Sequence, residues 1–270
     1  MVAARFQAIL LLMAVAVIPP PSLGLLALEG RAWFELASLL PALPLLERTP
    51  RGDGHPVLVL PGLLASDQST RALRWFLRRR GYHAHPWRLG RNLGPTPELI
   101  QALGQRFLAV RDRHHRKVSL VGWSLGGIYA RELARHFPDD VRQVITLASP
   151  FRDTTATNVG RIFRLTRAGR TPMPHDPETH ARLRTPPPVP VTCLYSRTDG
   201  IVAWQSCLEE EGPQRQNIEI PSSHIGMGHH PAALYIIADR LAQPEGVWQP
   251  FNPRSLPARL LGARTAAATT

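Results

Sequence analysis

Cysteine is scarce in this sequence of 270 residues. Only two occur, Cys193 and Cys207, and no pair has the CxxC spacing. Two thiols cannot form a disulfide framework. Cys193 lies in an apolar run, which favours a buried free thiol, and a Cys193–Cys207 bridge stays open only for an oxidising compartment.

Lysine is scarcer still, since it occurs once, at Lys117, and the net charge of +12 therefore comes from arginine. The basic residues are scattered over 71–80, 106–117 and 161–170, without interleaved aromatic residues on which bases could stack. Charge of this kind affects solubility and steering rather than recognition. We therefore expect no nucleic-acid partner.

Signatures of bound cofactors and metals are also missing. The sequence contains neither a GxxxxGK[ST] phosphate loop nor the GxGxxG spacing of dinucleotide-binding proteins. His83 and His85 could share one face of a strand, but no third metal ligand is evident. We expect neither a cofactor nor a metal ion.

No apolar run is long enough to be a confident transmembrane helix. The segment 1–24 has Arg5, an apolar run from Ala8 to Ile18 and then three prolines, whereas a spanning helix needs ~20 apolar residues. The run suits the core of a signal peptide, with Ser22-Leu23-Gly24 as a cleavage site. It suits an N-terminal helix that packs on the protein equally well. A cytoplasmic location and a membrane-associated or exported one both stay open, with peripheral membrane contact through 1–24 as a candidate interaction.

The rest of the chain alternates between short apolar runs and segments with helical spacing. Thr96-Pro97-Glu98, for example, has the cap, proline and acid that begin a helix. Such alternation predicts an α/β fold with a mostly parallel central sheet and helices on both faces. The expected strands are 57–60, 82–87, 118–121, 144–147, 191–195 and 217–220.

Two segments depart from this alternation within a single expected domain, 25–253. Residues 151–190 have no clean period and are rich in arginine, threonine and proline. A loop of that length inside a compact domain is usually functional, and we interpret it as an inserted lid. Residues 254–270 are expected to form a disordered tail.

The strand expected at 118–121 leads into Gly122-Trp123-Ser124-Leu125-Gly126-Gly127, which a helical pattern follows. G-x-S-x-G is short, but between a strand and a helix it predicts a sharp turn that projects the serine hydroxyl clear of the sheet. The N–H groups at the start of the helix would then favour a negative charge beside it. Ser124 is therefore the candidate nucleophile, and the alternative is a glycine-rich turn that only packs.

On these residues the chain resembles the α/β-hydrolase superfamily, on its lipase and esterase side, over roughly 55–241. The resemblance implies an eight-stranded, mostly parallel sheet and a catalytic triad in the order serine, acid, histidine. Asp199 follows the strand at 191–195, at the end where ligands bind in such sheets. His224 follows the strand at 217–220 and is favoured over His229 and His230, which directly precede the last helix.

The resemblance also implies two backbone donors for an oxyanion, the N–H groups of Leu63 and Leu125. The sequence departs from the lipases by having Pro61-Gly62 where His-Gly is usual. Because the donor is a backbone group, the change need not remove it.

The expected function is hydrolysis of a small-molecule or lipid carboxylic ester through an acyl-enzyme on Ser124. Leu64, Trp123 and Trp204 flank the predicted site residues and are expected to contact an apolar substrate. Two alternatives stay open. One is an acyltransferase or thioesterase with the same triad, and the other is a binding protein with the hydrolase fold and no catalysis.

Overall fold

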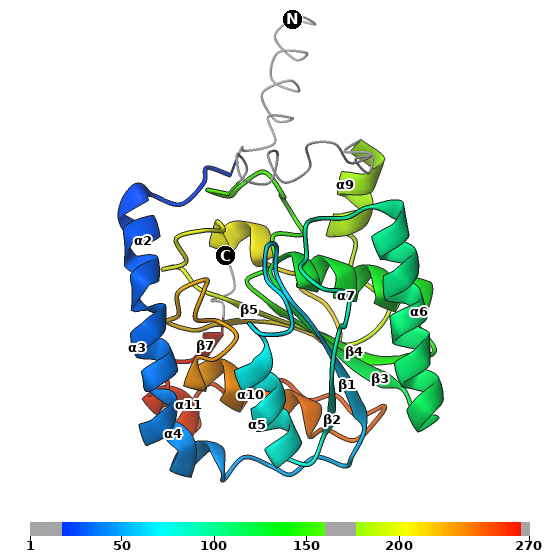
Figure 1. The fold of residues 1–270 in the computed structure, drawn as a ribbon. Helices are drawn as coiled ribbons and strands as arrows, with labels where there is room; N and C mark the ends of the chain where they lie inside the picture. Colours follow the sequence, from blue (N-terminus) through cyan, green and yellow to red (C-terminus); the bar gives the residue numbers. More distant parts are fainter. Residues whose placement is uncertain (1–17, 160–176, 266–270) are drawn as a thin grey trace, which may run out of the picture.

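A seven-stranded sheet forms the centre of the computed structural model, which describes residues 18–159 and 177–265 (Figure 1). The strands are ordered β2-β1-β3-β4-β5-β6-β7, and all neighbours are parallel except β6 and β7. Their bounds are β1 Pro56–Leu60, β2 His83–Pro86, β3 Val118–Trp123, β4 Val141–Leu147, β5 Val191–Tyr195, β6 Arg215–Glu219 and β7 Arg264–Thr265. The described residues thus contain one strand fewer than the eight that the resemblance implied.

Helices cover both faces of the sheet, and each has its own apolar core. Side chains alternate along β1, so that Val57 and Val59 join one core while Leu58 and Leu60 join the other. The first core lies under α4 (Leu39–Leu46), α5 (Arg71–Arg79) and α10 (Pro231–Leu241). The second lies under α6 (Pro97–His114), α7 (Leu125–His136) and α9 (Pro177–Arg184). This is the expected α/β class, and it explains why β1, β3, β4 and β5 are buried at every position.

An N-terminal arm, residues 23–46, precedes the first strand. It consists of α2 (Leu23–Ala27), the 3-10 helix η1 (Leu28–Arg31), α3 (Ala32–Ala37) and α4, and it runs along one side of the molecule (Figure 1). No helix in the described part of the chain is long and apolar enough to cross a membrane. The segment Ala8–Ile18 lies almost wholly outside the described residues.

The C-terminal region differs from the expected disordered tail. Residues 256–265 form α11 (Leu256–Leu260) and β7, and Ala258 and Ala263 are buried in the first core. β7 pairs antiparallel with β6, through Ile218–Thr265 and Glu219–Arg264. Pairing of the edge strand and burial of two small side chains hold a segment that was too short to give a periodic signal.

The interpretation of 151–190 as a lid concerns mainly residues 160–176, which lie outside the described residues. The described flanks pack on the domain. Phe151 is buried beneath the Arg131 guanidinium, and Arg131 also donates to the carbonyl of Leu183 in α9. Cys193 and Cys207 are both free and buried, so the bridge left open by the sequence is not formed.

Candidate active site

Ser124 occupies a sharp turn between β3 and α7. Its backbone has φ 53° and ψ −121°, a conformation that non-glycine residues rarely adopt. Its N–H donates to the carbonyl of Leu147 at 2.7 Å, and its own carbonyl accepts from the Gly127 N–H at 2.9 Å. A strained conformation held by hydrogen bonds on both sides is characteristic of functional sites.

The glycines around Ser124 are required by close backbone packing. A Cβ atom on Gly122 would lie 2.3 Å from the carbonyl oxygen of Gly126, and one on Gly126 would lie 2.3 Å from that of Leu60. A Cβ atom on Gly127 would lie 1.9 Å from the Ser149 hydroxyl. The glycines of the motif therefore let α7 begin directly against the ends of β1 and β3.

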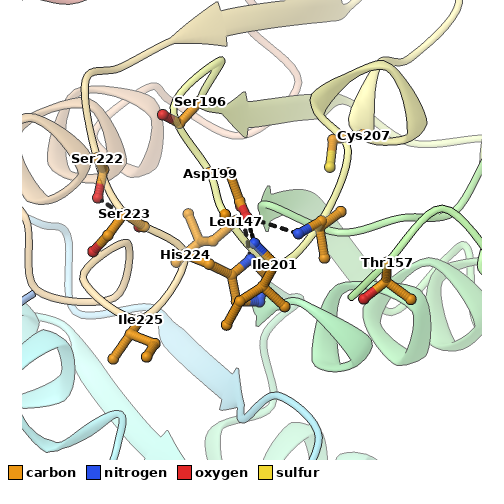
Figure 2. A network of polar contacts seen from close by, with 12 residues as sticks. Leu147, Thr157, Ser196, Asp199, Ile201, Cys207, Ser222, Ser223, His224 and Ile225 are labelled. Atoms are coloured by element: carbon orange, nitrogen blue, oxygen red, sulfur yellow. Dashed lines mark hydrogen bonds and ion pairs between the residues drawn. The ribbon is translucent and has the colours of Figure 1, made fainter. Parts of the chain in front are cut away.

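Asp199 and His224 form the hydrogen-bonded pair that the sequence reasoning placed together. Asp199 Oδ2 lies 2.7 Å from His224 Nδ1, and both side chains are almost fully buried (Figure 2). The other oxygen, Oδ1, accepts from the N–H groups of Ile201 at 2.8 Å and Val202 at 2.7 Å. Both oxygens of the carboxylate are thus fixed, and the imidazole is oriented by one of them.

The environment of His224 favours its protonated form. Burial acts to lower the pKa of His224, but the charge of Asp199, the hydrogen bond that Asp199 accepts from the ring and the charge of Glu29 outweigh it and raise the pKa above its ordinary value. An imidazolium is the form that a general base reaches after accepting a proton. The surroundings of His224 therefore suit that role.

The loop with the expected donor Leu63 is held by Asn92. The Asn92 side chain donates to the Pro61 carbonyl at 3.0 Å and accepts from the Tyr129 hydroxyl of α7 at 3.2 Å. The Asn92 backbone carbonyl accepts from the Leu64 N–H at 2.7 Å. Asn92 therefore ties the loop after β1 to the helix after Ser124.

The two expected oxyanion donors face the same region of the molecule. Gly62 packs on the serine, since a Cβ atom added to it would lie 3.1 Å from Ser124 Cβ. Within the described residues, the N–H groups of Leu63 and Leu125 have no hydrogen-bond acceptor. The first N–H groups of a helix lack partners within it, so Leu125 can donate outward.

A cavity of about 680 Å³ opens beside Ser124. Its lining includes Leu63, Ser124 and Leu125 at one end and His136 and Phe137 at the other. The walls are mostly apolar side chains from α6, α7 and α9, with threonines from the described flanks of the 151–190 segment. The cavity therefore follows α7 along its length, about 18 Å at ~1.5 Å per residue.

The residues expected to contact substrate lie elsewhere. Leu64, Trp123 and Trp204 are absent from the lining of this cavity among the described residues. Trp123 is buried and donates from Nε1 to the His224 carbonyl at 3.1 Å, while Trp204 stacks on Tyr195. Trp123 therefore links the serine turn to the histidine loop.

The rejected histidines have contacts of their own. His229 Nε2 donates to the Ala32 carbonyl of the arm at 3.1 Å, and His230 Nδ1 caps α10 by accepting from Ala232 N–H at 3.2 Å. No hydrogen bond joins Ser124 Oγ to His224 anywhere in the described structure. Hydrogen bonds of this kind are often long before substrate binds, so the catalytic role of the three residues stays a prediction.

A second relay of aspartate, histidine and serine lies at the opposite edge of the sheet. His55 Nδ1 is 2.5 Å from Asp53 Oδ1, and His55 Nε2 is 2.9 Å from the Ser119 hydroxyl. His55 and Ser119 are both 0% exposed. Ser119 is the second residue of β3 and is fully buried, so it cannot reach a substrate, and we assign this hydrogen-bonded set to the interior of the fold.

Three supporting residues were missed by the sequence reasoning: Asn92, Glu29 and Glu35. Asn92 lies in a loop with no motif that would distinguish it. The glutamates are the acids within an otherwise apolar segment, 25–46, and that contrast was the available signal. Both turn out to be buried beneath the loops that carry Asp199 and His224.

Comparison with known proteins supports the fold class. The family described as PGAP1-like alpha/beta domain matches residues 91–172, which include the turn at Ser124. No curated protein matches the chain. The similar solved structures are α/β hydrolases, and the chain has the α/β-hydrolase fold.

Three of these structures illustrate the similarity. Lipase B of Aspergillus fumigatus is 17% identical with a TM-score of 0.53, and the match covers 77% of this chain but 57% of that lipase. An alpha/beta superfamily hydrolase of Oenococcus oeni PSU-1 is 16% identical with a TM-score of 0.52, covering 70% of this chain and 91% of that one. A monoacylglycerol lipase of Paleococcus ferrophilus is 15% identical with a TM-score of 0.52, covering 70% and 96%. At these identities, the similarity shows the fold alone.

Proposed function

We propose that the protein is a serine hydrolase that cleaves carboxylic esters through an acyl-enzyme on Ser124. The observation that carries the proposal is the pairing of a strained, glycine-flanked serine with an Asp199–His224 hydrogen bond of 2.7 Å at the same edge of the sheet. β3, β5 and β6 are parallel, so the segments that follow them meet at one edge, where such sheets bind ligands.

In the proposed first step, His224 Nε2 takes the proton of the Ser124 hydroxyl as the oxygen attacks the ester carbonyl. Asp199 accepts a hydrogen bond from the Nδ1–H group and so holds the tautomer that leaves Nε2 free as base. The imidazolium then donates its proton to the departing alkoxide. The environment that raises the pKa of His224 also stabilises this imidazolium.

Leu63 and Leu125 are the proposed donors to the tetrahedral oxyanion, each contributing about 3 kcal/mol to lowering the barrier. In the second step His224 activates a water molecule, which attacks the acyl-enzyme and releases Ser124. An acyltransferase or thioesterase would use the same residues with another acceptor or leaving group. A non-catalytic binding protein would have no need of the strained serine.

The proposed acyl group is long and apolar. The cavity beginning at Ser124 has apolar walls that include Ile128, Leu103 and Leu133. A short acetyl group would leave most of its 680 Å³ unfilled. Trp123 and Trp204 are replaced here as substrate contacts by residues of α6 and α7.

The outer face of the arm is the proposed site of peripheral contact with a lipid surface. Trp33 is 77% and Phe34 78% exposed, and aromatic side chains favour the membrane interface. Other large apolar side chains of the arm exposed above one third are Leu23, Leu26, Leu28, Leu36 and Leu40. The net charge of +12 favours anionic lipids. A Trp33→Ala/Phe34→Ala variant should sediment less with phosphatidylglycerol vesicles, and unchanged sedimentation would contradict the proposal.

Ester hydrolysis by the Ser124→Ala variant tests the proposed function. We expect kcat on p-nitrophenyl esters to fall by several orders of magnitude, because the triad acts as a unit. Thermal unfolding should change little, since the hydroxyl has no hydrogen bond in the described structure. Turnover like that of the wild type in a folded variant would reject the assignment.

A further inference from the structure

Glu29 places a buried carboxylate between the two loops that carry Asp199 and His224. It lies in η1 of the arm and is 5% exposed. Its Oε1 accepts from the Gly200 N–H at 2.8 Å and from the His224 N–H at 2.9 Å. Its Oε2 accepts from the Ile225 N–H at 2.9 Å. One side chain thus binds the residue after the acid, the histidine itself and the residue after it.

All the hydrogen-bond donors to Glu29 are main-chain N–H groups. Within the described residues Glu29 forms no ion pair, and all three of its partners are N–H groups. A carboxylate that accepts several backbone N–H bonds is stabilised in its charged form. A hydrogen bond to a charged group is stronger than a hydrogen bond between two neutral groups. Glu29 therefore holds the main chain of both loops through backbone hydrogen bonds and not through an ion pair.

Glu35 repeats this arrangement one step further along the arm. Its Oε1 accepts from the Ser223 N–H at 2.8 Å and from Arg31 Nε at 3.1 Å. Its Oε2 accepts from the hydroxyls of Ser223 at 2.7 Å and Ser222 at 3.2 Å. Ser222 and Ser223 directly precede His224 in the loop (Figure 2). Arg31 also donates to both the carbonyl and the hydroxyl of Thr198, beside Asp199, at 2.8 Å each.

Two glycines show independently that the arm and the loops fit closely. A Cβ atom on Gly200 would lie 2.2 Å from the carbonyl oxygen of Leu25 in α2. A Cβ atom on Gly226 would lie 1.5 Å from Glu35 Oε2. Neither glycine has a positive φ, so close approach to the arm, rather than backbone conformation, explains their small size.

We propose that Glu29 and Glu35 are positioning residues, through which the N-terminal arm holds the Asp199 and His224 loops in register for catalysis. This inference rests on the proposed function. The alternative is that the arm stabilises the fold without affecting the reaction. The two differ in what they predict for a folded variant, because a misplacement of about 1 Å in a catalytic group can cost about 100-fold in rate.

The test compares Glu29→Gln and Glu35→Gln with the control Glu47→Gln. Glu47 belongs to the same stretch of chain, but its carboxylate is 53% exposed and pairs with Arg79 on the surface. For Glu29→Gln we expect kcat to fall about 10- to 100-fold with KM within about twofold. Glu35→Gln should act in the same direction, and Glu47→Gln should match the wild type.

The pH profile supplies a readout that a merely structural role would not move. Asp199 and Glu29 are the charged groups that raise the pKa of His224. Loss of the Glu29 charge should therefore move the acidic limb of kcat/KM to lower pH. Glu29→Asp keeps the charge and should restore the limb toward its wild-type position. Glu35→Gln, whose site is farther along the loop, should leave the limb in place.

Hydrogen exchange separates this inference from the proposed function. In Glu29→Gln the amides of Gly200, His224 and Ile225 should exchange faster than in the wild type, whether or not the protein hydrolyses esters. If the wild type does not hydrolyse esters but the variant shows this exchange pattern, the proposed hydrolase function is rejected, while the role of Glu29 in holding the two loops is retained. Folded glutamine variants with wild-type kcat, pH profile and exchange would overturn the inference. If Glu29→Gln does not fold, Glu35→Gln decides, through a lowered kcat and faster exchange of the Ser223 amide, whose N–H binds Glu35.

Discussion

Acidification should destabilise the fold through His55 before it affects the carboxylates. Burial, with the charges of Arg142 and Arg116, lowers the pKa of His55 from its ordinary value of 6.5 to about 4, although Asp53 acts in the opposite direction. The unfolded chain binds a proton at His55 near pH 6.5, and the folded protein does so only near pH 4. The contribution of His55 to the stability of the fold is therefore fully present above pH 6.5 and is lost as the pH falls toward 4.

The lowered pKa of His55 corresponds to a contribution of about 3 kcal/mol to the free energy of unfolding, at about 1.36 kcal/mol per pKa unit. The side chain is 0% exposed, so solvent screening does not reduce this value greatly. His85 contributes with the same sign, because burial and His114 lower its pKa to about 4 as well. His224 contributes with the opposite sign, since its folded pKa is raised and its stabilisation is lost as the pH rises.

Urea denaturation of His55→Gln between pH 7 and 4.5 isolates the His55 contribution. The variant should be less stable than the wild type at pH 7, because Asp53 and Ser119 lose a partner. Its free energy of unfolding should then change less with pH. Parallel curves for His55→Gln and the wild type would refute the reasoning.

Three further predictions concern the site. Gly126→Ala should lower the free energy of unfolding by about 1–3 kcal/mol and reduce kcat, because its Cβ atom would overlap the Leu60 carbonyl of β1. Gly30→Ala is the control, since a Cβ atom there would meet no atom within 4 Å, and it should do neither. Equal effects of the two variants in urea denaturation would contradict this. Ile128→Trp should reduce kcat/KM for palmitoyl esters more than about tenfold and change it little for acetyl esters, which a chain-length series measures. His224→Ala should be as inactive as a serine variant, whereas His230→Ala should lose only a helix cap; an inactive His230→Ala would reject the choice of histidine.

Much of the sheet and the central pair could be predicted because their signals are local. The apolar run at 118–121 and the glycines beside Ser124 encode a strand and a turn within ten residues of chain. Asp199 and His224 each follow a strand end, and parallel strands bring such ends together. The strands β1 to β6 accordingly overlap the ranges expected from the sequence, although β4 begins earlier, at Val141, and β6 at Arg215; β7 was not expected.

The supporting parts of the site depend on contacts between distant segments. Glu29 meets His224 across 195 positions of sequence, and nothing in its neighbourhood encodes that contact. Trp123 was expected to contact substrate because it adjoins Ser124, but it ends β3 and its side chain packs in the first core. The tail at 256–265 was missed for a similar reason, since pairing with β6 determines its order.

Mapping the adduct of a fluorophosphonate probe tests the central claim most directly. After labelling of the folded protein and digestion, mass spectrometry should find the adduct on Ser124, and labelling should disappear in Ser124→Ala. The rate of labelling should fall in His224→Ala, because the base that activates the hydroxyl is lost. A folded wild type that takes up no probe, or takes it up at Ser119 or another serine, would contradict the account.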